Sequence, residues 1–121
     1  MLAFHPGRAI YNGSDHEWQL WDWNVLTTVV TVAYCADGAY CDYPIAPFRT
    51  RNVSKALLCH AHRHGVRVVS FTYWNWNTPD TWAQLANASR RREWVEWEVS
   101  AAQRLGLDGV NVTTHRISHH A

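Results

Sequence analysis

The chain has 121 residues, of which 47% are hydrophobic and 17% are charged, as is typical of a globular domain with a buried core. The formal net charge is only +1, and the one dense basic run, Arg90-Arg91-Arg92, is interpreted as a solvated first turn of a helix. We therefore predict neither nucleic acid nor membrane as a partner. No apolar stretch approaches the roughly 20 residues of a membrane span, and no signal peptide is visible.

The first half of the chain predicts two strands. Residues 2–4 form a short strand, which the Pro6-Gly7 pair ends. Residues 27–33 are rich in β-branched side chains and predict a strand buried on both faces. Residues 34–51 contain glycine and proline without a clear period, which predicts a long loop.

The second half predicts helices that alternate with strands. A helix beginning near Asn52 is expected to end at Gly65, followed by a strand over 66–71. A short helix is predicted within 79–88. The most regular helix runs over 89–105 and ends at Gly106, and a strand over 107–112 follows. The apolar stripe of this helix over 89–105 consists of Trp94, Trp97, Ala101, Ala102 and Leu105.

The alternation of strands and helices predicts a parallel sheet with helical crossovers. Both a barrel and a doubly wound sheet give this pattern, so periodicity alone leaves the choice open. A closed (β/α)8 barrel needs about 250 residues, so this chain could hold about half of one.

The segment from Asp108 to Val112, Asp-Gly-Val-Asn-Val, is the most informative motif in the chain. It resembles the start of the signature Asp-Gly-x-x-x-Asp-x-Glu of glycoside hydrolase family eighteen, in the version with Asn that is typical of di-N-acetylchitobiases. Three upstream segments, 22–29, 59–69 and 92–109, are similar to chitobiase-like sequences in the expected order. The resemblance implies the N-terminal half of a family-eighteen TIM (β/α)8 barrel, with about four parallel strands and intervening helices over residues 1–112.

The carboxylates that complete the family's motif are absent. At their positions stand Thr113, in place of the aspartate, and His115, in place of the general-acid glutamate. In the family that glutamate protonates the glycosidic oxygen while the substrate's acetamido group attacks the anomeric carbon. We therefore expect ordinary hydrolysis to be lost and the catalytic site to be reduced to two remnants, Asp108 and Asn111. Asp108 is equally compatible with a turn or cap role.

Tryptophans supply the candidate sugar contacts. Trp74 and Trp76 follow the third strand at its C-terminal end, where barrel active sites are built. We predict that they either contact a saccharide or pack against other protein side chains. Trp94 and Trp97 are assigned to a helix–barrel interface. The remaining candidates for core packing near the second strand are Trp18, Trp21 and Trp23.

Histidines and cysteines predict no metal site or cofactor. His60 and His64 would share one face of a helix and His62 another, without the further ligands of a zinc site, so a solvated helix end is the preferred interpretation. The three cysteines allow at most one intramolecular bridge, and the spacing of Cys35 and Cys41 permits one without requiring it. Four Asn-x-Ser/Thr sequons, compatible with the secretory pathway, begin at Asn12, Asn52, Asn87 and Asn111.

The resemblance implies an ancestral hydrolase of β-1,4-linked N-acetylglucosamine oligosaccharides, lysosomal or secreted, with such an oligosaccharide as partner. Two alternatives remain open: a noncatalytic chito-oligosaccharide-binding protein, and a truncated gene product without function. Residues 113–121 are expected to form a divergent, unstructured tail. The open edges of a half-barrel predict self-association.

Overall fold

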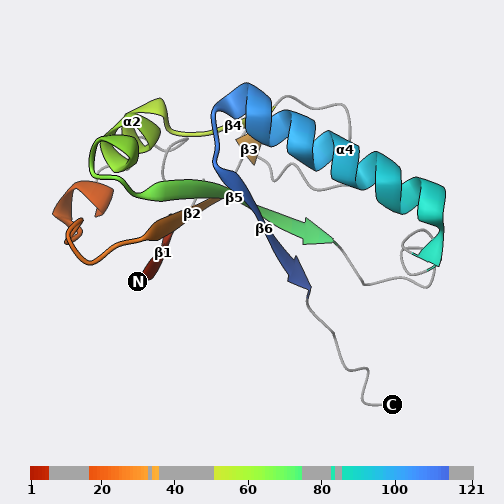
Figure 1. Ribbon diagram of the computed structural model, residues 1–121, viewed down its shortest axis with the longest axis horizontal. Coiled ribbons are helices and arrows are strands. Elements are labelled where there is room, and N and C mark those ends of the chain that lie inside the picture. The colour runs from red at the N-terminus through yellow and green to blue at the C-terminus, as the bar shows by residue number, and fades with distance from the viewer. Residues whose placement is uncertain (6–16, 33, 36–50, 75–82, 84–85, 115–121) are drawn as a thin grey trace, which may run out of the picture.

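The computed structural model describes residues 1–5, 17–32, 34–35, 51–74, 83 and 86–114. Figure 1 shows a parallel sheet with helices α2 and α4 on the same side of it. Along the chain the elements are β1 (Leu2–His5), the 3-10 helix η1 (Glu17–Leu20), β2 (Thr28–Val32), β3 (Tyr34–Cys35), β4 (Arg51–Asn52), α2 (Lys55–Arg63), β5 (Arg67–Trp74), α4 (Ala88–Leu105) and β6 (Gly109–Thr114).

The main sheet has four strands in the order β1-β2-β5-β6, and every neighbouring pair is parallel. Strand order therefore follows chain order, as in a barrel wall in which each new strand is added beside the previous one. This arrangement confirms the predicted α/β architecture of four parallel strands with intervening helices. Strands β1 and β6 are the two edges of the sheet among the described residues.

The helix ends are set by side-chain and glycine caps. At the start of α2, the Ser54 hydroxyl accepts a hydrogen bond from the Leu57 backbone N–H at 3.1 Å. At the start of α4, the Asn87 side chain accepts from two backbone N–H groups. Gly65 after α2 and Gly106 after α4 have positive φ angles of 69° and 73°, a conformation that glycine adopts without steric cost. Both glycines were predicted to end their helices.

The core lies between α2 and the β2–β5 part of the sheet. Leu57 and Ala61 of α2 pack against Val29 and Val68, and all four are at most 1% exposed. Burial of these apolar side chains removes their surface from water and stabilises the α2–sheet contact.

Two tryptophans close this core at the end that precedes β2. Trp18 and Trp23 are 5% and 8% exposed, and the Trp23 indole N–H donates to the Trp18 carbonyl at 3.0 Å. The half-buried Trp21 packs against the same cluster. The predicted packing role of these three residues is thereby confirmed.

Some boundaries differ from those predicted. The long loop over 34–51 has short strands at its two ends, because β3 and β4 pair antiparallel. Strand β5 runs to Trp74, three residues beyond the predicted end at Phe71. Strand β6 includes Thr113 and Thr114, which were predicted to belong to the unstructured tail. Most of the predicted helix over 79–88 lies outside the described residues.

No helix among the described residues is long and apolar enough to cross a membrane.

Candidate functional site

The C-terminal ends of β5 and β6 bring two of the predicted site positions together. Tyr73 pairs in register with Thr113, and Trp74 pairs with Thr114. Strand β5, which ends with Trp74, and strand β6, which carries the motif, therefore end side by side. Trp76 and His115, the remaining candidates at this end, lie outside the described residues.

Asn111 occupies the middle of β6, in register with Phe71 of β5, and is half-buried. Its neighbours Val110 and Val112 line the space between β6 and α4. Because side chains alternate along a strand, Asn111 lies on the face of the sheet away from α4. In a barrel wall covered by helices, that face is the interior.

Asp108, the first residue of the motif, lies just before β6, at the opposite end of the strand from Thr113. Its Oδ2 accepts a hydrogen bond from the Val68 backbone N–H at 2.7 Å and lies 2.8 Å from His62 Nε2. These bonds tie the start of β6 to the start of β5 and to α2. Of the alternatives that the sequence left open for Asp108, this geometry favours a structural role.

Hydrogen bonding to the charged form keeps the pKa of Asp108 below its ordinary value. Partial burial would raise the pKa, but the Val68 N–H, the bond and charge of His62, and then the Arg67 charge together lower it. The carboxylate is therefore the stable form at neutral pH, so Asp108 accepts hydrogen bonds and does not act as a proton donor there.

The histidines of α2 are engaged in contacts and are not simply a solvated helix end. The His60 and His64 rings lie 4.4 Å apart between centroids, and the His60 ring lies 4.8 Å from that of Trp23 and 5.1 Å from that of Trp18. His62 contacts Asp108. Among the described residues no three His, Cys, Asp or Glu side chains are grouped as a metal site would require. The exposed Cys59 is a free thiol.

The partly buried His60 and its neighbour His64 predict a pH-dependent stability. Partial burial, the neighbouring His64 and then Arg63 lower the pKa of His60 from 6.5. A lowered folded-state pKa means that the unfolded chain binds the proton more tightly, so we expect the free energy of unfolding to decrease as the pH falls below 6.5. His60→Phe should keep the aromatic contact and reduce this decrease, as measured by urea unfolding over a pH series. An unchanged pH dependence in His60→Phe would assign it to other groups.

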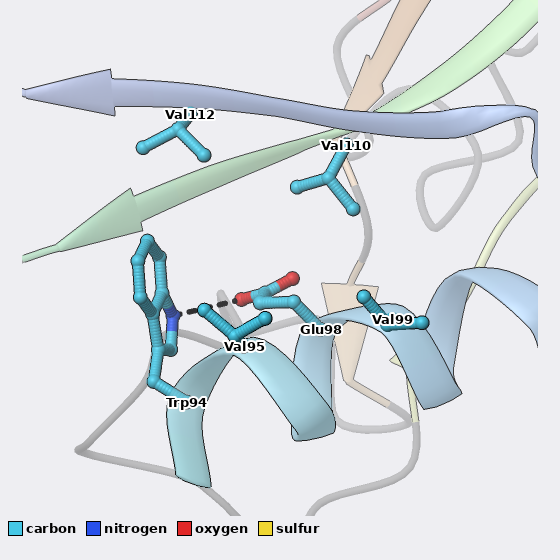
Figure 2. A pocket seen from close by; sticks show the side chains of 6 residues that line it. All are labelled: Trp94, Val95, Glu98, Val99, Val110 and Val112. Atoms are coloured by element: carbon cyan, nitrogen blue, oxygen red, sulfur yellow. Dashed lines mark hydrogen bonds between the residues drawn. The ribbon is translucent and has the colours of Figure 1, made fainter. Parts of the chain in front are cut away.

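A small cavity lies between α4 and β6. Its volume is about 110 Å³, and its lining residues are Trp94, Val95, Glu98, Val99, Val110 and Val112. Figure 2 shows the Trp94 and Glu98 side chains reaching from α4 toward β6. The Trp94 indole N–H donates a hydrogen bond to Glu98 Oε1 at 3.2 Å. This bond gives a partner to the Glu98 carboxylate, which belongs to a residue that is only 3% exposed.

This chain is similar to a di-N-acetylchitobiase and to a chitinase. Di-N-acetylchitobiase from Bos taurus is 26% identical over 103 residues, which are 85% of this chain and 45% of the relative. The chain is thus similar to a di-N-acetylchitobiase over most of its own length. A chitinase from Bacteroides thetaiotaomicron matches in structure with a TM-score of 0.59 at 15% identity, over 98% of this chain and 37% of that protein. No protein-family model matches.

These similarities confirm both the resemblance and the fold class that the motif implied. The chain spans less than half the length of either of these relatives. The match to a chitinase structure over nearly all of this chain agrees with a partial (β/α)8 barrel and decides the choice that periodicity left open. The barrel, in contrast to the doubly wound sheet, also explains why strand order follows chain order.

Two contacts in this structure were not predicted from sequence. The Asp108–His62 contact joins residues 46 positions apart, and no local sequence pattern predicts a contact at that separation. Glu98 is buried within the helix stripe that was assigned to apolar residues alone. Its position four residues after Trp94 is the available signal, because residues at that spacing share a helix face.

Proposed function

We propose that this chain is the N-terminal half of a glycoside-hydrolase-like barrel that binds β-1,4-linked N-acetylglucosamine oligosaccharides without hydrolysing them. The observation that carries the proposal is the register of β5 and β6, in which Tyr73 and Trp74 stand beside Thr113 and Thr114 at the C-terminal strand ends. Parallel barrels build their ligand sites at these ends.

Saccharide binding is supported by the residue types at this end. The sequence Tyr73-Trp74-Asn75-Trp76-Asn77 combines aromatic faces, which pack on the apolar faces of pyranose rings, with amides that exchange hydrogen bonds with hydroxyls. Similarity to a chitobiase and a chitinase favours N-acetylglucosamine among the possible sugars.

The absence of hydrolysis follows from the residues at the two decisive motif positions. Thr113 carries no charge and cannot stabilise the cationic intermediate that forms when the acetamido group attacks. His115 is a poor replacement for the acid, because its ring differs from glutamate in length and shape. The Asp108 carboxylate is held by Val68 and His62 at the other end of the strand.

Calorimetric titration of the full chain with chitobiose and chitotriose, followed by chromatography of the mixture, tests both parts of the proposal. We expect heat of binding and no released monosaccharide. Released N-acetylglucosamine would overturn the loss of hydrolysis. The absence of both heat and product would overturn binding and favour a chain without function.

A pair of variants locates the binding. Trp74→Ala should weaken binding by roughly tenfold, since an aromatic stacking contact contributes on the order of 1 kcal/mol. Trp97→Ala changes a half-buried tryptophan of α4 and serves as the control, with thermal melts to show that both variants fold. Equal weakening by both substitutions would contradict a site at the end of β5.

We further propose that the isolated chain self-associates through its sheet edges. Beside edge strand β6, apolar side chains of α4 and β6 are largely exposed: Val95 by 50%, Val99 by 45% and Val112 by 53%. An edge strand offers unpaired N–H and C=O groups, and the adjoining apolar surface favours burial against another chain.

The double substitution Val95→Glu with Val99→Lys is therefore expected to shift the chain toward monomer in sedimentation velocity. The two charges are four residues apart in α4, an orientation that also supports the helix. Leu20→Glu is the matched control, because Leu20 is 89% exposed on η1 and not on this edge. A wild-type chain that is monomeric at all concentrations would contradict the proposal.

A further inference from the structure

One sequon of the chain lies at an exposed helix start. Asn87, followed by Ala88 and Ser89, caps α4, and its Oδ1 accepts from the backbone N–H groups of Ser89 at 2.9 Å and Arg90 at 3.2 Å. The side-chain Nδ2 makes no hydrogen bond with any described residue. Every residue from 86 to 93 is exposed, so a bulky hydrophilic group at Asn87 would project into solvent.

The other two sequons within the described residues lie in less accessible surroundings. Asn111 is half-buried inside β6 and makes its own contacts. The sequon of Asn52 begins in β4, and its third residue, Ser54, is 6% exposed with its hydroxyl accepting from the Leu57 N–H. Asn12 lies outside the described residues.

We propose that Asn87 is an N-glycosylation site of this protein. In the transfer reaction Nδ2 bonds to the anomeric carbon of a lipid-diphosphate-linked oligosaccharide, the carbon–phosphate-oxygen bond breaks, the lipid diphosphate leaves, and the amide gives up one proton. The asparagine is the acceptor of an Asn-x-Ser/Thr sequon whose middle residue is not proline.

The cap geometry makes this modification compatible with the fold. Glycosylation changes Nδ2 and keeps the amide carbonyl, so Oδ1 can still accept from Ser89 and Arg90. A glycan on Asn111 would instead have to be accommodated against the sheet. The inference requires entry into the secretory pathway, which the chitobiase resemblance favours, but it does not depend on sugar binding or hydrolysis by this chain.

The test is expression of the full chain behind a cleavable secretory leader in mammalian cells, with gel mobility compared before and after peptide-N-glycosidase. Mass spectrometry of the treated protein identifies the site, because the enzyme converts a glycosylated Asn to Asp. We expect conversion at Asn87 in the folded, secreted protein.

Three variants separate the modification from the helix cap. Asn87→Asp and Ser89→Ala each remove the sequon and keep an oxygen acceptor at the cap, so each should lose one glycan and retain the helix. Ser89→Thr keeps the sequon and should keep the glycan. Unconverted Asn87 in the secreted wild-type chain, or an unchanged mobility shift in Asn87→Asp, would overturn the proposal.

Discussion

Leu57→Ala is expected to lower the free energy of unfolding by about 2–5 kcal/mol, the largest effect of any single substitution considered for this chain. Leu57 is 1% exposed and lies in the cluster formed by α2, the sheet and the buried tryptophans. Truncation removes three carbons from a fully buried side chain and leaves a cavity that the surrounding structure fills only in part.

Urea unfolding followed by tryptophan fluorescence measures this effect, because Trp18 and Trp23 belong to the same core cluster. Leu20→Ala is the control: its side chain is 89% exposed, so a change within about 0.5 kcal/mol is expected. Equal effects of the two substitutions would mean that the α2–sheet core does not contribute to stability as its burial implies.

The sequence predicted the sheet well because its signals are local. Residues 27–33 predict β2 through a run of β-branched side chains, and Gly65 and Gly106 mark helix ends where a left-handed backbone is needed. The short β3–β4 pair was missed, because strands this short carry little propensity and depend on pairing across a long loop.

The candidate site was predictable only in part. The motif indicated that Thr113 and His115 stand at the positions of the missing carboxylates. The last strand was predicted to end at Val112, so the place of Thr113 inside β6 was missed. The sequence could not show that Tyr73 and Thr113 are partners in register, since that pairing depends on tertiary contacts. Nor could it show that α2 contributes His62 to Asp108, because a contact between distant segments leaves no periodic pattern.

The second large prediction concerns Asp108 and tests whether this motif residue stabilises the fold or has a catalytic role. Asp108→Ala should lower the free energy of unfolding by about 1–3 kcal/mol, because it leaves the Val68 N–H without its acceptor. The His62 contact adds little, because the His62 and Asp108 side chains are 42% and 34% exposed and exposed ion pairs contribute about 0–1 kcal/mol. Asp108→Asn, which keeps an acceptor oxygen, should lose less.

The pH dependence of the same variant gives an independent readout. The folded-state pKa of Asp108 lies below 3.8, so its stabilising contribution is complete above that pH and is lost as the pH falls through the lowered pKa. Asp108→Ala should therefore lose part of the acid-induced decrease in stability that the wild type shows. The control is Asp22→Ala, because the carboxylate of the exposed Asp22 accepts a hydrogen bond from the nearby Asn24 N–H at 3.1 Å and joins no distant segments among the described residues. If both variants were equally stable and followed the same acid titration, the strand-linking role of Asp108 would be wrong, and a functional origin for this carboxylate would regain support.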